Sequence, residues 1–151
     1  MLNILIIEDN EDDAHLLELA FKREKVAVSL RIAGNGAKAI SYLEGQGDYA
    51  DRRDSPFPNV IFTDLKMPVM DGFEVLKWLK THPVSSVLPV MVLTASQADD
   101  DVESAYRLGA NAYMVKPSTL QELQVMVRTA HEFWKNCEKP KRASLDQVDR
   151  N

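Results

Sequence analysis

The chain has 151 residues, enough for one folded domain with a buried core, and we expect no room for a separate output domain. Its net charge of −5 disfavours general affinity for nucleic acid, because phosphate backbones are held by an excess of lysine and arginine, so we expect no direct DNA binding. No apolar run approaches membrane-spanning length and no signal-type region opens the chain, so we expect a cytoplasmic protein without a membrane partner.

Strand-like and helix-like segments alternate through the first half of the chain. Residues 4–7 form a continuous apolar run, the pattern of a strand buried on both faces. Cap-forming and acidic residues then predict the start of a helix that ends at about Glu24. Residues 26–33 predict a second strand, and residues 37–43 predict a short second helix. Residues 45–58 are polar and interrupted by glycine and proline, which indicates a long loop, either a tolerated insertion or a contact with a partner.

The same alternation continues in the second half. Residues 60–62 form a third apolar strand, and a helix that begins at Gly72 ends before Pro83, because proline does not continue a helix. A fourth strand over residues 88–94 precedes a helix whose acidic first turn, from residue 99, suits the positive end of the helix dipole. The remaining segments are a strand over residues 112–115, a helix over residues 120–136, and an aperiodic tail over residues 137–151 that we expect to be flexible.

Polar side chains stand at the ends of four of the predicted strands. Glu8 and Asp9 follow the first strand, Asp64 follows the third, Thr94 closes the fourth and Lys116 follows the fifth. Five β/α units in succession predict a parallel sheet with helices on both faces, and the carboxyl ends of parallel strands meet at one edge. We therefore expect these five side chains to converge on one site.

Through these five residues the chain resembles the receiver domain of two-component response regulators. The motif Met-Pro at residues 67–68 and the motif Lys-Pro at residues 116–117 belong to the same resemblance, which covers roughly residues 2–136. It implies a receiver domain over residues 1–136 with a flavodoxin-like α/β fold, a three-layer sandwich around a five-stranded parallel sheet in the order 2-1-3-4-5. It also implies a phosphoacceptor signalling protein and not an enzyme, with at most intrinsic autodephosphorylation.

Three carboxylates in one site predict a bound cation, because like charges do not easily share a site as anions. Ligands made only of oxygen favour Mg²⁺, whereas zinc needs histidine or cysteine, and none stands near these motifs. We expect Glu8, Asp9 and Asp64 to hold the metal, directly or through water. The resemblance adds the backbone carbonyl of Lys66 as a ligand, and Glu8 stands where the family more often has aspartate.

The polar residues then have distinct predicted roles in phosphoryl transfer. Asp64 is the nucleophile that becomes an aspartyl phosphate. Lys116 is a compact cation that pairs with Asp64 before the reaction and with the phosphoryl oxygens after it. Thr94 offers a hydroxyl donor to the phosphoryl group, and Ala95 keeps the surroundings small and offers a backbone N–H.

The resemblance also implies a conformational switch. The added charge pulls the Thr94 loop inward, and Tyr113 moves with it. The surface that changes is formed by the fourth helix, the fifth strand and the fifth helix. Its candidate contacts are Val102, Tyr106, Gln124 and the exposed side of the last helix.

The family pattern makes three further statements about the site. The side chains of Lys66 and Ser96 flank the attacking water during dephosphorylation and tune the lifetime of the phosphorylated state. The peptide bond before Pro117 is cis in the family, which fixes the direction of Lys116. Ser118 departs from the bulky apolar residue that is frequent at its position.

The residues at 8–13, EDNEDD, and the long segment before Pro58 resemble the single-domain regulators that are paired with bacterial phytochromes. This predicts a sensor histidine kinase of the phytochrome type as partner, and a homodimer through the surface of the fourth helix, fifth strand and fifth helix.

Two alternatives remain open at this point. A Mg²⁺-dependent phosphohydrolase of the haloacid dehalogenase type also uses aspartate, threonine and lysine, but it needs a second acid two residues after the nucleophile, where this chain has Lys66. A degenerate receiver that acts unphosphorylated as a binding module is the other, and the intact set of Asp9, Asp64, Thr94 and Lys116 argues against it.

Overall fold

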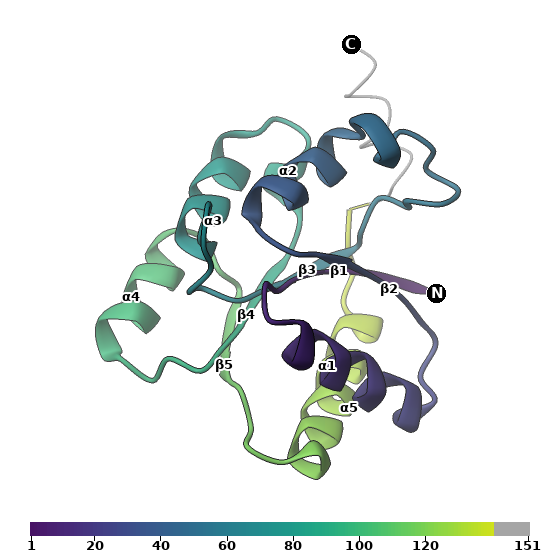
Figure 1. Cartoon of the computed structure of the whole chain (residues 1–151), viewed down its shortest axis with the longest axis vertical. Helices are drawn as coiled ribbons and strands as arrows, with labels where there is room; N and C mark the ends of the chain where they lie inside the picture. Colours follow the sequence, from purple (N-terminus) through teal and green to yellow (C-terminus); the bar gives the residue numbers. More distant parts are fainter. Residues whose placement is uncertain (141–151) are drawn as a thin grey trace.

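The computed structural model describes residues 1–140, in which strands and helices alternate in the predicted order (Figure 1). The strands are β1 (Leu2–Ile7), β2 (Val28–Ala33), β3 (Val60–Thr63), β4 (Val90–Thr94) and β5 (Ala112–Val115). The α-helices are α1 (Glu11–Glu24), α2 (Gly36–Glu44), α3 (Gly72–Thr81), α4 (Asp99–Arg107) and α5 (Leu120–Asn136). Two 3-10 turns, η1 (Gly47–Tyr49) and η2 (Ser85–Val87), precede β3 and β4.

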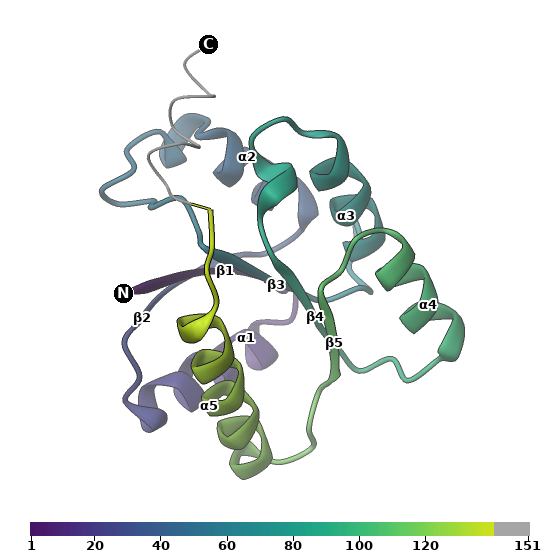
Figure 2. The same cartoon turned by 180° about the vertical axis from the view of Figure 1, so that it is seen from behind.

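The strands form one parallel sheet in the order β2-β1-β3-β4-β5, which confirms the predicted flavodoxin-like topology. Helices α1 and α5 cover one face and α2, α3 and α4 cover the other, so the domain has three layers, as Figure 2 shows from behind. In the register of the sheet, Ile7 lies beside Thr63 and Thr94 lies beside Val115. The residues that follow these strands therefore start from the same edge.

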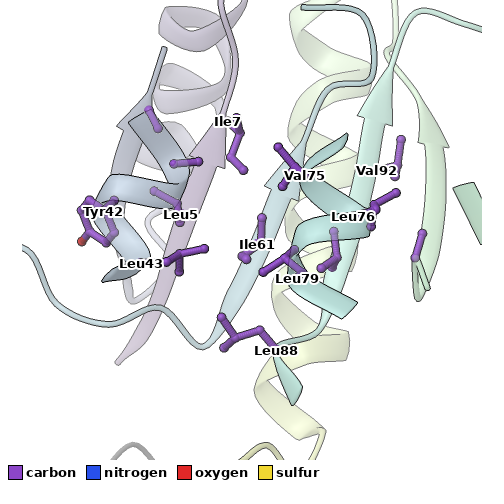
Figure 3. Close-up of a cluster of buried hydrophobic side chains, with 14 of the residues drawn as sticks. Leu5, Ile7, Tyr42, Leu43, Ile61, Val75, Leu76, Leu79, Leu88 and Val92 are labelled. Atoms are coloured by element: carbon purple, nitrogen blue, oxygen red, sulfur yellow. The ribbon is translucent and has the colours of Figure 1, made fainter. Parts of the chain in front are cut away.

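Each face of the sheet buries its own apolar cluster, because successive strand residues point to opposite faces. Leu5, Ile7 and Ile61 pack against α2 and α3 (Figure 3). Ile6 and Phe62 pack against α1 and α5 on the other face. The residues of α1 and α5 in this second cluster are Leu17, Ala20, Phe21, Val127, Ala130 and Trp134.

Two strands begin two residues later than the sequence predicts. The amide of Val28 donates to the carbonyl of Val26, which forms a tight turn before β2. The residues before β4 form the η2 turn, and Pro89 has no N–H to give to the sheet, so β4 starts at Val90. Helix α2 is one residue longer at each end than predicted.

The connection over residues 45–58 is held against the domain by Arg52. The guanidinium donates to the carbonyls of Tyr42 (2.8 Å) and Leu43 (2.9 Å) in the last turn of α2. It also lies over the rings of Tyr42 and Phe57. The Tyr42 hydroxyl donates to the carbonyl of Pro56 at 2.7 Å. This connection therefore gives a partner to the Leu43 carbonyl at the end of the helix, and a second partner to the Tyr42 carbonyl, which also accepts from the Gly45 amide.

Helix α5 ends at Asn136, and the Lys139 ammonium donates to the carbonyls of Trp134 (2.5 Å) and Cys137 (2.7 Å) just beyond it. Residues 141–151, which make up most of the predicted flexible tail, lie outside the described residues. In the part of the chain that is described, none of the helices combines the length and apolar character needed to cross a bilayer.

Candidate functional site

The three predicted acids meet at the carboxyl edge of the sheet. Glu8 and Asp9 follow β1, Asp64 follows β3, and their carboxylate oxygens lie within 4.8 Å of one another. Glu8 and Asp64 are buried, whereas Asp9 is exposed. The convergence follows from the pairing of β1 with β3, which puts the residues that leave these two strands side by side.

Lys116, which follows β5, reaches the same point. Its ammonium donates to Asp64 Oδ2 at 2.9 Å and to Asp13 Oδ2 at 2.8 Å, and it also donates to Glu8 Oε1. The expectation of a cis bond before Pro117 is wrong for this structure, because no cis peptide bond occurs in residues 1–140. A trans X–Pro bond is the more stable form by about 0.5–1 kcal/mol, and the three carboxylate partners fix the direction of Lys116 by themselves.

The charges in this cluster shift one another's pKa values in different directions. Burial raises the pKa of Glu8 to about 7, although the hydrogen bond and charge of Lys116 oppose the rise. Burial also acts to raise the pKa of Asp64, but hydrogen bonds with Lys116, Thr94 and the Leu65 amide outweigh it and leave this pKa below its usual value. Asp64 is therefore the acid of the pair that stays ionised, and Glu8 is the one that takes up a proton more readily.

The same carboxylates act on Lys116. Burial acts to lower the pKa of the ammonium, but its hydrogen bonds with Asp13, Asp64 and Glu8 raise the pKa above its ordinary value. The side chain of Lys116 is therefore a permanent cation at neutral pH.

The backbone around Asp64 is fixed by hydrogen bonds and by one close approach. Asp64 Oδ1 accepts from the amide of Leu65 at 2.7 Å, and the Thr63 hydroxyl donates to the carbonyl of Asp64 at 2.9 Å. The amide of Gly72, at the start of α3, donates to the carbonyl of Leu65 at 2.9 Å. A Cβ at Gly72 would lie 2.1 Å from the Asp64 carbonyl oxygen, so only glycine lets the chain fold back this closely.

The turn between β3 and α3 also carries backbone strain. Val69 has a φ of 70° and its side chain is exposed. A β-branched residue in the left-handed region is a rare outlier that costs about 1–3 kcal/mol. Two anchors directly follow the strained residue: the Met70 carbonyl accepts from the Gly36 amide at 3.3 Å, and Asp71 forms a capping box with Glu74 at the start of α3.

The loop after β4 brings the predicted phosphoryl-binding residues to the same edge. Thr94 is buried and contributes a hydrogen bond that lowers the pKa of Asp64, and its carbonyl accepts from the Lys116 amide at 2.8 Å. Ala95 is exposed on the rim. The carbonyl of Ser96 accepts from the Tyr113 hydroxyl at 2.9 Å, so the half-buried Tyr113 is tied to this loop.

The side chain of Lys66 makes contacts with helices α3 and α4. Its ammonium pairs with Asp101 at 3.3 Å, at the start of α4, and lies 5.4 Å from the centre of the Phe73 ring. The Ser96 hydroxyl donates to the same Asp101 carboxylate at 2.6 Å. The two predicted dephosphorylation-tuning residues thus share one acid. The role of the Lys66 carbonyl as a metal ligand stays a prediction.

Three residues have contacts that the sequence did not reveal. Asp13 pairs with Lys116, although its place in the first turn of α1 already accounts for an acid there. Asp101 is likewise one of three acids in the first turn of α4. Gln124 was wrongly predicted to lie on the readout surface: its amide donates to Glu24 of α1 at 3.1 Å.

The donor set fits a hard divalent cation. The carboxylates of Glu8, Asp9 and Asp64 offer oxygen ligands only, and the Lys116 ammonium already serves two of these acids as a counter-ion. Because three carboxylates surround a single ammonium, the cluster can accept a second cation.

Comparison with known proteins gives the same family for sequence and structure. The response regulator receiver domain matches residues 4–128. Response regulator Rcp1 of Synechocystis sp. is 38% identical over 131 residues, 87% of each chain. The structure of its Mn²⁺-bound form has a TM-score of 0.81 and 36% identity and covers 93% of this chain and 100% of that chain.

Two other solved structures are similarly close. Response regulator RPA3017, from red light signaling of R. palustris, has a TM-score of 0.88 and 31% identity, and the phosphorylated cyanobacterial phytochrome response regulator RcpA has a TM-score of 0.84 and 33% identity. Each comparison covers 93% of this chain and 99% of the other. These relatives are signalling proteins, so this chain is one too and not an enzyme such as a phosphohydrolase. The chain belongs to the response regulator receiver family.

Proposed function

We propose that the chain accepts a phosphoryl group on Asp64 from a sensor histidine kinase. The observation that carries this proposal is the 2.9 Å contact between the Lys116 ammonium and Asp64 Oδ2, beside the carboxylates of Glu8 and Asp9. An acid with a lowered pKa is ionised and nucleophilic at neutral pH, and a fixed cation next to it can then pair with phosphoryl oxygens.

The transfer step forms one bond and breaks one. A carboxylate oxygen of Asp64 forms a bond to phosphorus while the bond from phosphorus to a histidine nitrogen of the donor breaks, and the nitrogen keeps the electron pair. Lys116 then shares its charge with the new phosphoryl group, and the Thr94 hydroxyl donates to another phosphoryl oxygen. Ala95 leaves room for the group at the rim and offers its amide.

Mg²⁺ is the proposed cofactor, held by Glu8, Asp9, Asp64 and the backbone carbonyl of Lys66. When bound, it neutralises charge on the phosphoryl oxygens. Support comes from the oxygen-only ligand set and from the Mn²⁺-bound form of the relative Rcp1. Glu8 is longer than aspartate by one methylene, so we assign it a contact to the metal through water.

The proposed donor is a sensor kinase of the bacterial phytochrome type. RcpA is a phytochrome response regulator and RPA3017 acts in red light signaling, and both cover nearly the whole described domain with the same fold. A receiver paired with such a kinase works in the cytoplasm, and the match over residues 4–128 includes no DNA-binding module.

The proposed output is a change of the α4-β5-α5 surface, which also offers a homodimer contact. Phosphorylation draws Thr94 inward and with it the loop to which the Tyr113 hydroxyl is bonded. Tyr106 of α4 and Phe133 of α5 are exposed by 47% and 58%, so both are available to a partner. Gln124 is excluded from this surface by its contact with α1.

Intact-mass measurement after incubation with acetyl phosphate and Mg²⁺ tests the chemistry. We expect one phosphoryl adduct on the wild type, none on Asp64→Asn, and none on the wild type when EDTA removes the metal. Asp54→Asn, which changes an exposed acid in the 45–58 connection, is the matched control and should be phosphorylated like the wild type. An adduct on Asp64→Asn would contradict the assignment of the nucleophile. No adduct on the wild type would favour the unphosphorylated binding module.

A further inference from the structure

One hydrogen-bonded chain of side chains links the loop after β3 to the start of α4 and to β5. The Lys66 ammonium lies 3.3 Å from Asp101 Oδ2, and the Ser96 hydroxyl donates to the same oxygen at 2.6 Å. Ser96 Oγ also accepts from the amide of Ala98 at 3.3 Å, and the Ser96 carbonyl accepts from Tyr113. Asp101 is therefore the common partner of Lys66 and Ser96, which come from two different loops.

We propose that Asp101 is a positioning residue that sets the lifetime of the aspartyl phosphate by holding Lys66 away from the phosphoryl group. The inference rests on the proposed function, since it concerns the loss of the phosphoryl group that Asp64 accepts. Within residues 1–140, Asp101 is the acid whose carboxylate lies within 4.0 Å of the Lys66 ammonium.

The reaction that Asp101 controls is hydrolysis. A water oxygen forms a bond to phosphorus as the bond from phosphorus to the Asp64 oxygen breaks. The carboxylate keeps the electron pair, the water gives its proton to solvent, and inorganic phosphate leaves. Water must approach phosphorus opposite Asp64, and the family pattern predicts that the side chains of Lys66 and Ser96 flank that water.

Release of Lys66 from Asp101 would slow this reaction for two physical reasons. A free ammonium would pair with non-bridging phosphoryl oxygens, which carry more negative charge in the intact acyl phosphate than in a metaphosphate-like transition state, so the pairing favours the ground state. Its long side chain would also cover the path of the water. Asp101 prevents both effects while it competes with the phosphoryl group for the same cation.

Position in the helix alone does not explain this arrangement. Asp99, Asp100 and Asp101 all lie in the first turn of α4, where the helix dipole favours any acid. Asp99 and Asp100 are exposed, whereas the side chain of Asp101 is 20% exposed and contacts both Lys66 and Ser96. Asp100→Asn is therefore a matched control that removes a charge from the same turn without touching the network.

The experiment follows the decay of the phosphorylated protein. Each variant is phosphorylated with acetyl phosphate and Mg²⁺, the donor is removed, and loss of the adduct is timed by intact mass. We expect Asp101→Asn to decay about two- to fivefold more slowly than the wild type, the size of effect that a partly exposed ion pair supplies. The phosphoryl adduct of Asp100→Asn should decay at the wild-type rate. Asp101→Glu, which keeps the charge, should restore most of the wild-type decay rate.

A second genetic background, Lys66→Met, distinguishes the proposed positioning role of Asp101 from a merely structural one. In Lys66→Met, which has no ammonium to release, Asp101→Asn should leave the decay rate unchanged. Equal or faster decay of Asp101→Asn in the wild-type background overturns the proposal, and so does an undiminished slowing in Lys66→Met. Failure of the wild type to form any adduct on Asp64 is a different result, because it overturns the proposed function itself.

Discussion

The site depends on a single ammonium shared by three carboxylates. The side chain of Lys116 is 19% exposed, and those of Glu8 and Asp64 are 5% and 10% exposed. Removal of one partner from such a cluster leaves charges without compensation in a poorly solvated place, and this costs more than the pairing itself contributes. Lys116 is thus a structural counter-ion as well as a proposed phosphoryl-binding group.

Lys116→Met should lower the free energy of unfolding by about 2–3 kcal/mol in metal-free buffer, less than for a fully buried pair because Asp13 is partly exposed. Mg²⁺ should restore stability in the variant by more than it adds to the wild type, because a dication replaces the missing counter-ion. Urea unfolding with and without Mg²⁺ measures both quantities. Lys135→Met, which changes an exposed lysine, should unfold like the wild type; equal midpoints for Lys116→Met and Lys135→Met would refute the counter-ion role.

The residue types at the strand ends were enough to predict that Asp9, Asp64, Thr94 and Lys116 share one site. The topology of a parallel sheet alone brings the carboxyl ends of its strands to the same edge. The contacts of Asp101 could not be predicted in this way. A helix N-terminus explains an acid at that position without any partner, and the partner comes from a loop 35 residues away in the chain.

Helical periodicity, which identifies the buried face of α5, was applied incompletely to Gln124. This residue follows Leu120 by four positions and precedes Val127 by three, so it lies beside the apolar stripe and not opposite it. Its bond to Glu24, together with that of Arg128 to the same acid, joins α5 to α1. The exposed side of α5, which was also predicted, therefore remains the part of this helix that is available to a readout surface.

The sequence alone left two interpretations of the 45–58 connection open, a tolerated insertion or a contact with a partner. Arg52 makes it part of the domain by binding the carbonyls at the end of α2 and by stacking on Tyr42 and Phe57. No composition rule identifies which arginine in a polar loop will turn inward, since Arg53 next to it is exposed.

Arg52→Lys should lower the free energy of unfolding by about 1–3 kcal/mol, because an ammonium cannot reproduce the planar, multidentate donation of a guanidinium. Arg53→Lys is the neighbouring control and should change stability by no more than about 0.5 kcal/mol. Thermal or urea unfolding compares the two. If both variants unfold alike, the connection does not depend on Arg52.

For the molecule as a whole, alternation of strands and helices was enough to predict the layers, and the family resemblance supplied the strand order. The boundaries of β2 and β4 were missed because they depend on local turns, one closed by the Val28 amide and the other by the absence of an amide at Pro89. The trans peptide bond before Pro117 could not be predicted from the sequence either, because an X–Pro bond can adopt both isomers.

The 45–58 connection enters the amino end of β3 (Figure 1), and Asp64, the proposed phosphoacceptor, follows the other end of the same strand. Residues 46–48 are exposed, and Gly47 has open space around it. These residues are therefore a suitable insertion site for a fluorescent or affinity module. A fusion inserted between Gly47 and Asp48 should take up a phosphoryl group from acetyl phosphate as we propose for the parent. A chimaera that folds but takes up none, while the parent does, would show that the two ends of the sheet are coupled.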